Sequence, residues 1–291
     1  MKTIELKSPQ LQATISLNGA ELIFLGNEAT ENILWSKQTA HWNRVAPNLF
    51  PIVGRLFDDS FTFQDQSYSL SQHGFARDRE FEIVEQSETE IRLRLVSDTG
   101  SMSVYPFPFV FDVVYSLSES GLTISYETQN TGKDVMHYSV GGHPAFQLNE
   151  PLENYYLEFD SAIQLERQEL NGSYFSGEGI YYGVSNRLDL GDELFENDAF
   201  VLKDPQFQSV SLKHENGETL GQMHCDSWTA IGFWTKKDAP FLCIEPWWGW
   251  ADHMDSTGKL EEKAGIRSLN PGEKEIVRYE LRREVEKSFF D

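Results

Sequence analysis

Residues 241–250 read FLCIEPWWGW, and both the fold and a candidate site can be argued from this stretch. Its first four residues form an apolar run that is typical of a buried β-strand. Glu245 then places a carboxyl group where an aliphatic residue would continue the pattern. Pro246 is expected to end the strand, because it has no N–H and a fixed φ. Burial beside the three tryptophans that follow would raise the pKa of Glu245. The alternative is that Glu245 pairs with an arginine and that the tryptophans fill the core.

The rest of the chain alternates apolar and polar residues with a period of two, which is typical of half-buried strands. Examples are Leu11–Leu17, which ends at the turn Asn18-Gly19, and the later runs Phe109–Leu117 and Val277–Leu281. We find no long helical periodicity, internal repeat or linker. Many short strands at regular spacing predict an all-β fold, a sandwich or barrel, with one domain over residues 1–291.

The pattern is weaker between residues 150 and 200. There it predicts three short strands, at Tyr155–Phe159, Ile163–Leu165 and Ile180–Val184, with polar loops between them. Residues 41–60 contain two prolines and a glycine among apolar residues, and they predict an irregular segment packed on the core.

Composition excludes several classes of partner. The 291 residues carry 24 basic and 46 acidic side chains, a formal charge of −22. Such a surface repels nucleic acid and anionic lipid, so neither is expected as a partner. Two cysteines give no disulfide framework. The N-terminus has no signal-peptide pattern and no apolar run is long enough to span a membrane, so we expect a cytoplasmic protein.

Three titratable residues interrupt the strand pattern beside glycine or proline: His73, His143 and Glu245. Two imidazoles and a carboxyl group suffice for general acid–base chemistry near neutral pH, although each alone is more typical of a structural role. The tripeptide His224-Cys225-Asp226 lacks the spaced second half of a zinc site, so no metal is predicted. No motif of a nucleophilic serine or of nucleotide binding is present.

Three motifs together resemble a known family. HGFARD (73–78), GGHPAF (141–146) and LCIEPWWG (242–249) are similar, in this order, to the aldose 1-epimerase (galactose mutarotase) family, most closely its LacX-like branch. The similarity includes NLFPIVGRL (48–56) and KAGIRSLNPGE (263–273). It implies a large antiparallel β-sandwich, the galactose mutarotase-like supersandwich, with a sugar site in a concave face. It also implies interconversion of the α and β anomers of an aldose without a cofactor.

The resemblance assigns a role to individual residues. Glu245 corresponds to the base that removes the C1 hydroxyl proton, and His143 to the acid that protonates the ring oxygen. His73 and Arg55 correspond to residues that hold and polarise the sugar. Trp247 offers an aromatic face to the apolar side of a sugar.

Two further residues keep two interpretations each. Asp198 resembles the substrate-binding aspartate of the family, or is a turn residue. Arg77 resembles an arginine of the hexose-6-phosphate branch, where a guanidinium binds phosphate, or it pairs with Asp78. The better-known galactose mutarotases have Asn where Gly54 precedes Arg55, so the sugar itself stays open.

We therefore predict a mutarotase for a hexose or hexose 6-phosphate, acting as a monomer or homodimer. A carbohydrate-binding β-sandwich without catalysis is the alternative. A glycoside hydrolase is a third hypothesis, but it normally needs two carboxyl groups, and Asp198 is a weak second candidate beside Glu245.

Overall fold

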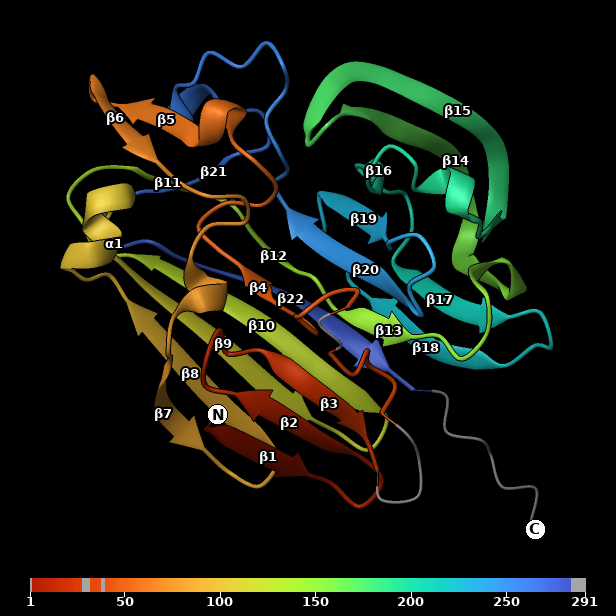
Figure 1. Ribbon diagram of the computed structural model, residues 1–291. Helices are drawn as coiled ribbons and strands as arrows, with labels where there is room; N and C mark the ends of the chain where they lie inside the picture. The colour runs from red at the N-terminus through yellow and green to blue at the C-terminus, as the bar shows by residue number, and fades with distance from the viewer. Residues whose placement is uncertain (1, 28–31, 38–39, 284–291) are drawn as a thin grey trace.

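A computed structural model describes residues 2–27, 32–37 and 40–283 (Figure 1). Most strands belong to one 15-stranded sheet, and every strand pair in it is antiparallel. In these residues the only α-helix is α1 (Thr99–Val104), and none of their helices is long and apolar enough to cross a membrane. The predicted all-β class is confirmed.

The strands are, in chain order, β1 (Thr3–Lys7), β2 (Gln12–Ser16), β3 (Leu22–Gly26), β4 (Asn48–Leu49), β5 (Ser60–Phe63), β6 (Gln66–Ser69), β7 (Glu82–Gln86), β8 (Glu90–Val96), β9 (Phe109–Leu117), β10 (Gly121–Asn130), β11 (Met136–Tyr138), β12 (Val140–Gly142), β13 (Ala145–Gln147), β14 (Tyr155–Asn171), β15 (Tyr174–Asp189), β16 (Phe200–Lys203), β17 (Ser209–His214), β18 (Thr219–His224), β19 (Ala230–Trp234), β20 (Phe241–Trp248), β21 (Arg267–Leu269) and β22 (Lys274–Arg282). Short 3₁₀ turns lie at Phe57–Asp59, Ala76–Asp78, Leu152–Asn154, Asp192–Leu194 and Leu260–Glu262.

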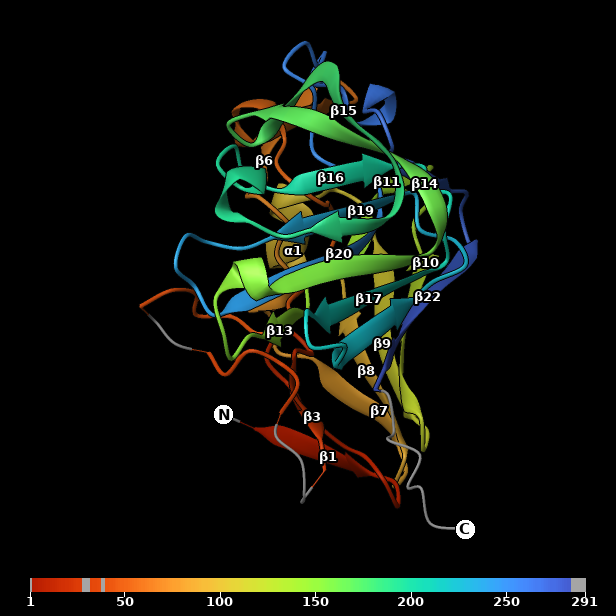
Figure 2. The same cartoon turned by 90° about the vertical axis from the view of Figure 1, so that its right-hand side faces the viewer.

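The large sheet has two halves whose strands run in different directions, as Figure 2 shows for β8–β10 against β16, β19 and β20. Strand β22 joins the halves, because it pairs with β10 along one edge and with β18 along the other. The β1–β2–β3 sheet packs against β8 and β9 through residues such as Ile15, Leu93 and Val113, all of which are completely buried. This packing of two sheets on a shared apolar layer is the predicted sandwich.

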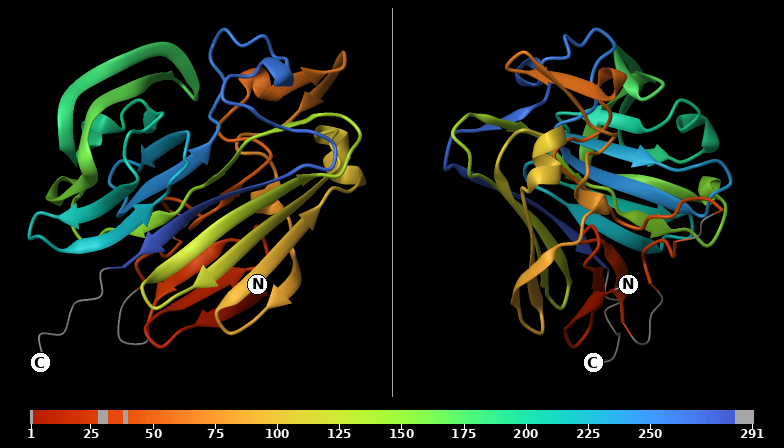
Figure 3. Two further views of the ribbon diagram at one scale, coloured as in Figure 1. Left: turned by 180° about the vertical axis from the view of Figure 1, so that it is seen from behind. Right: turned by 60° about the vertical axis from the view of Figure 1, so that its left-hand side comes forward.

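Strands β14 and β15 form a long hairpin that arches over β16 (Figures 1 and 3). The prediction of separate short strands here is wrong in extent. The register of the hairpin shifts three times, the first time between Glu158 and Ile163. At each shift one of the two strands carries extra residues relative to the other, and the hairpin continues past it. The apolar period is therefore interrupted, and one continuous strand looks in the sequence like several short ones.

The prediction that Pro246 ends its strand is also wrong, because β20 continues to Trp248. Alternate N–H groups of a strand point to opposite sides, and the N–H of Ile244 donates to Pro144 O. The nitrogen of Pro246 faces the same side, where the chain passes from β12 to β13. Pairing to β20 is interrupted there, between Gly141 and Ala145, so the missing donor removes no ladder hydrogen bond.

Candidate active site

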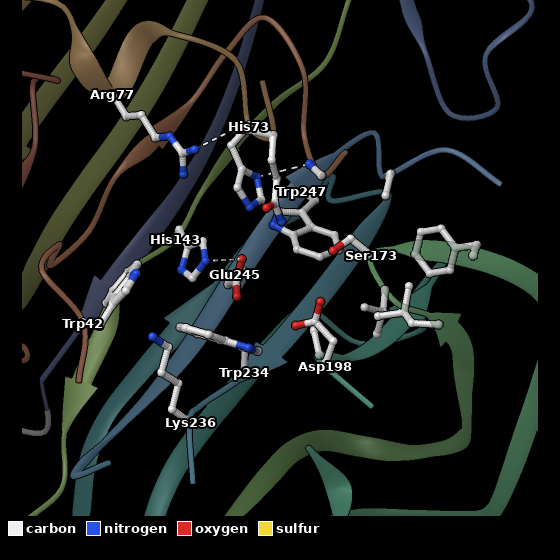
Figure 4. A pocket seen from close by; sticks show the side chains of 17 residues that line it. Trp42, His73, Arg77, His143, Ser173, Asp198, Trp234, Lys236, Glu245 and Trp247 are labelled. Carbon is white, nitrogen blue, oxygen red and sulfur yellow. Dashed lines mark hydrogen bonds and ion pairs between the residues drawn. The ribbon is translucent and has the colours of Figure 1, made fainter. Parts of the chain in front are cut away.

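A cavity of about 350 Å³ opens between the end of the β14–β15 hairpin, strands β16, β19 and β20, and the segments that carry the HGFARD and GGHPAF motifs. Figure 4 shows its principal side chains. The lining residues are Trp42, Gly54, Gln72, His73, Arg77, His143, Leu170, Ser173, Phe175, Asp198, Ala199, Val201, Trp234, Lys236, Glu245, Trp247 and Ala251. Its volume is in the range of small-molecule sites.

The structure brings Glu245 and His143 together in the wall of this cavity. The Nε2 atom of His143 lies 3.2 Å from Oε2 of Glu245 (Figure 4). The sheet register explains the approach, because Gly141 lies opposite Trp247 and Ala145 lies opposite Cys243. His143 therefore lies opposite Glu245, in the connection between β12 and β13.

The pair is held in its uncharged form by burial. Glu245 is 2% exposed and His143 7%. Burial, and then the nearby Asp198, raise the pKa of Glu245 well above its ordinary value. Burial, and then the charge of Arg77, lower the pKa of His143 to about 3. Among the described residues no arginine or lysine forms an ion pair with Glu245, contrary to the structural alternative considered for it. These shifts favour a protonated carboxyl group on Glu245 beside a neutral imidazole on His143.

His73 lies next to His143 in the wall of the cavity. Its ring centroid lies 5.6 Å from that of His143. Its Nδ1 accepts a hydrogen bond from the N–H of Gly54 at 3.1 Å, and burial lowers its pKa. The ring is therefore neutral with its proton on Nε2, a donor for a hydroxyl group. The next residue, Gly74, has φ +68°, and a Cβ atom there would meet Phe50 O at 2.3 Å, so only glycine fits.

Aromatic rings surround the imidazole of His143. The ring of Trp42 lies 4.9 Å away at 32°, and that of Trp234 lies 5.7 Å away at 89°. Trp247 lines the cavity beside Glu245. Aromatic faces suit both the apolar side of a sugar and a transient imidazolium ion.

Asp198 and Arg77, for which the sequence leaves two interpretations each, also line the cavity. Asp198 has φ +70°, and burial raises the pKa of its carboxyl group. Arg77 donates through Nη2 to Gln72 O at 2.6 Å. Its buried Nε has no hydrogen-bond partner but lies 3.9 Å from Oδ2 of Asp78, an ion-pair contact. Burial, and then neighbouring Arg44, lower the pKa of Arg77 to about 10.

Arg55 is the one predicted residue that the structure does not place in the cavity. Its guanidinium donates to both carboxylate oxygens of Asp59, at 2.7 and 2.5 Å, in a neighbouring hollow. Gly54, directly before it, lines the cavity instead. The motif thus places the backbone of this segment at the site, but Asp59 holds the Arg55 side chain elsewhere.

Comparison with known proteins identifies the family. The family model for aldose 1-epimerase matches residues 2–282. The chain belongs to the aldose 1-epimerase family. It is 27% identical over 284 residues to the chromosomal protein LacX of Lactococcus lactis subsp. lactis, covering 92% of this chain and 95% of LacX.

Two solved structures share the fold over almost the whole chain. A galactose mutarotase related enzyme from Lactobacillus acidophilus has a TM-score of 0.91 and 29% identity, with 97% of each chain covered. A galactose mutarotase-like protein from Lactobacillus casei has a TM-score of 0.92 and 25% identity, with 97% of this chain and 99% of that chain covered. The predicted LacX-like branch, the sandwich fold and the enzyme class, an isomerase of the aldose 1-epimerase type, are confirmed.

Sequence reasoning missed several lining residues of this aldose 1-epimerase family member. Trp42, Lys236 and Ser173 come from the irregular segment, from the β19–β20 connection and from the hairpin end. The tryptophan in an otherwise irregular segment was the one available signal. The other two lie in polar loops, and nothing local distinguishes them from solvent-exposed residues.

One group of side chains in the described residues could hold a metal ion. It consists of His143, Cys243 and Glu245, whose ligand atoms lie within 4.8 Å of one another. The His224 side chain, considered earlier with Cys225, instead contacts Asp226 at 3.1 Å and Ser209 at 2.9 Å.

Proposed function

We propose that this protein is a mutarotase that interconverts the α and β anomers of a hexose or hexose 6-phosphate by general acid–base catalysis. The observation that carries the proposal is the 3.2 Å approach of His143 and Glu245 in an aromatic-walled cavity. Each positioned acid or base contributes about 10²–10⁴-fold in rate. Two such groups are sufficient for opening a hemiacetal ring.

The chemical step uses the two tautomers of the pair. With Glu245 ionised and His143 protonated, the carboxylate removes the proton of the C1 hydroxyl while the imidazolium protonates the ring oxygen. The C1–O5 bond breaks, and the open aldehyde faces the neutral pair. Rotation about C1–C2 and the reverse proton transfers close the ring on the other face. The pair holds one proton in total before and after, so no exchange with solvent is required.

The resting structure favours the neutral tautomer, so the ionic one must form when sugar binds. The direct approach of Nε2 and Oε2 gives the proton a path from Glu245 to His143. Sugar hydroxyls and the Nε2–H of His73 then supply hydrogen bonds that stabilise the carboxylate.

The cavity also carries basic groups that suit a phosphorylated sugar. Arg77 and Lys236 both line it, on the side of Trp42 in Figure 4, although the protein as a whole is strongly acidic. The buried Nε of Arg77 has no hydrogen-bond partner, and its ion-pair contact with Asp78 is long, at 3.9 Å. A guanidinium binds phosphate through two hydrogen bonds, so a 6-phosphate could use a donor to which the protein gives no hydrogen bond.

Glycoside hydrolysis is a second candidate, because two carboxyl groups, Glu245 and Asp198, line the same cavity. A carboxyl group of raised pKa beside a second one is the pattern of glycosidases. Release of reducing ends from aryl glycosides and oligosaccharides tests this function separately from anomer exchange.

The experiment is a panel of free aldoses and their 6-phosphates, scored for α/β exchange by NMR with wild-type protein. Glu245→Gln protein purified identically controls for contaminating mutarotase. Accelerated exchange with wild type alone supports the proposal. Binding of sugar without acceleration favours the non-catalytic alternative. Arg77→Met should reduce exchange of 6-phosphates selectively, and equal loss for free aldoses would remove the phosphate role.

A further inference from the structure

Cys243 is a buried thiol for which the proposed reaction has no use. It is fully buried, lies two residues before Glu245 on β20, and does not line the cavity. Residues two apart on a strand face the same side. The thiol and the carboxyl group of Glu245 therefore lie next to each other on the same face of the sheet.

The three ligand-type atoms of Cys243, Glu245 and His143 lie within 4.8 Å of one another. Zinc binds sulfur at ~2.3 Å and nitrogen or oxygen at ~2.0–2.2 Å, so tetrahedral ligands lie roughly 3.5 Å apart. Nε2 of His143 and Oε2 of Glu245 are already 3.2 Å apart. A change in the Cys243 side chain that moves its sulfur by about 1 Å would bring the sulfur into the same coordination sphere.

A second observation points to a ligand at this place. Oε2 of Glu245 is buried and has no hydrogen-bond partner, although it lies close to His143. An unsatisfied buried oxygen is costly, and a metal ion would satisfy it. The bound state would combine a divalent cation with one thiolate and one carboxylate, so its net charge would be zero, which suits a buried position.

We propose that Cys243, Glu245 and His143 form a chelating site for a thiophilic divalent cation such as Zn²⁺, whose binding inhibits the enzyme. The cation enters through the cavity, bonds to the sulfur, one carboxylate oxygen and one imidazole nitrogen, and displaces the thiol and carboxyl protons to solvent. The fourth position faces the cavity and holds water. Because Glu245 and His143 are both occupied, sugar and metal compete. The inhibitory part of the proposal rests on the proposed mutarotase function.

The test uses Co²⁺ as a spectroscopic probe on chelator-treated full-length protein. Wild type should bind one Co²⁺ per chain and show a near-ultraviolet sulfur-to-cobalt charge-transfer band. Cys243→Ala should lose the band, and Cys225→Ala, the matched control at the other buried cysteine, should keep it. Circular dichroism confirms that both variants fold. Absence of the band in wild type, or its loss in Cys225→Ala alone, would overturn the site.

The activity arm separates this inference from the proposed function. Zn²⁺ should inhibit wild-type exchange competitively with sugar, and a chelator should restore it. Loss of an outer-shell partner already weakens metal binding 10–100-fold, so Cys243→Ala should be at least about 100-fold less sensitive to Zn²⁺ while it retains basal activity. If chelation abolishes activity and Zn²⁺ restores it, the inhibitory role is wrong. If wild type accelerates no exchange, the proposed function fails, and the cobalt band still decides the site.

Discussion

Two buried glutamates in this molecule have opposite surroundings. Glu245 is 2% exposed and faces a neutral imidazole, and burial raises its pKa. Glu127 on β10 is 8% exposed, but Arg92 donates to both of its oxygens, at 2.7 and 3.1 Å, and Lys274 donates to one of them. Although desolvation opposes it, the pKa of Glu127 is lowered by these bonds.

The difference shows what distinguishes a functional carboxyl group in this fold. Burial is common to both residues and so identifies neither. A carboxylate with cationic partners is a structural group, whereas one buried without them can change its protonation state during a reaction. A functional carboxyl group must also be accessible to a substrate, and Glu245 meets this condition because it lines the cavity.

The largest expected effect separates the two glutamates by activity. Glu245→Gln keeps the shape of the side chain but cannot accept a proton, so anomer exchange should fall at least about 100-fold. Glu127→Gln should leave the rate unchanged. Polarimetry of both variants at saturating sugar checks this, and a wild-type rate in Glu245→Gln would remove that residue from the mechanism.

The reverse ranking is expected for stability. Glu127→Gln removes the charge that Arg92 and Lys274 bind, and should lower the free energy of unfolding by about 1–3 kcal/mol at neutral pH. The pKa of Glu127 is lower in the folded than in the unfolded state, so this stabilisation is present above the unfolded value, 4.5, and is lost as pH falls through the folded value. Urea unfolding should show that the free energies of unfolding of wild type and Glu127→Gln become equal at acid pH.

Glu245→Gln should show the opposite pH dependence. The folded state keeps the Glu245 proton at pH values where the unfolded chain has released it, so unfolding releases a proton and wild-type stability falls as pH rises above 4.5. Glutamine removes this term. As pH rises above 4.5, the free energy of unfolding of the variant should increase relative to that of wild type by up to about 1.4 kcal/mol per pH unit. A constant difference from pH 5 to 8 would show that the pKa of Glu245 is not raised.

Much of this comparison could not have been predicted from the sequence. Apolar alternation predicted the strands, and His143 and Glu245 were visible as polar residues that break it. Glu127 also lies in a strand among apolar neighbours, but its partners come from β8 and β22, and only the sheet register brings them together. Arg55 shows the same limit, because the motif fixed its position but not the direction of its side chain.

The smallest expected effect concerns the tryptophan rings that surround His143, where Glu127 has cationic side chains. The ring of Trp42 lies against this imidazole, tilted by 32°, and can stabilise its protonated form by about 0.5–2 kcal/mol. Trp42→Leu should therefore slow exchange by roughly 2–30-fold and move the acid–base limits of the rate profile. Trp42→Phe should restore most of the rate. Equal loss in both variants, with an unchanged pH profile, would reduce Trp42 to a packing role.

The central claim is that Glu245 and His143 share one proton, which rests on the carboxyl group when the site is empty. Infrared difference spectroscopy of wild type against Glu245→Gln at pH 7 tests it most directly. We predict a carbonyl stretching band of a protonated carboxylic acid that is absent from the variant and that weakens when sugar binds. A difference spectrum with only carboxylate bands in the sugar-free protein would contradict the claim.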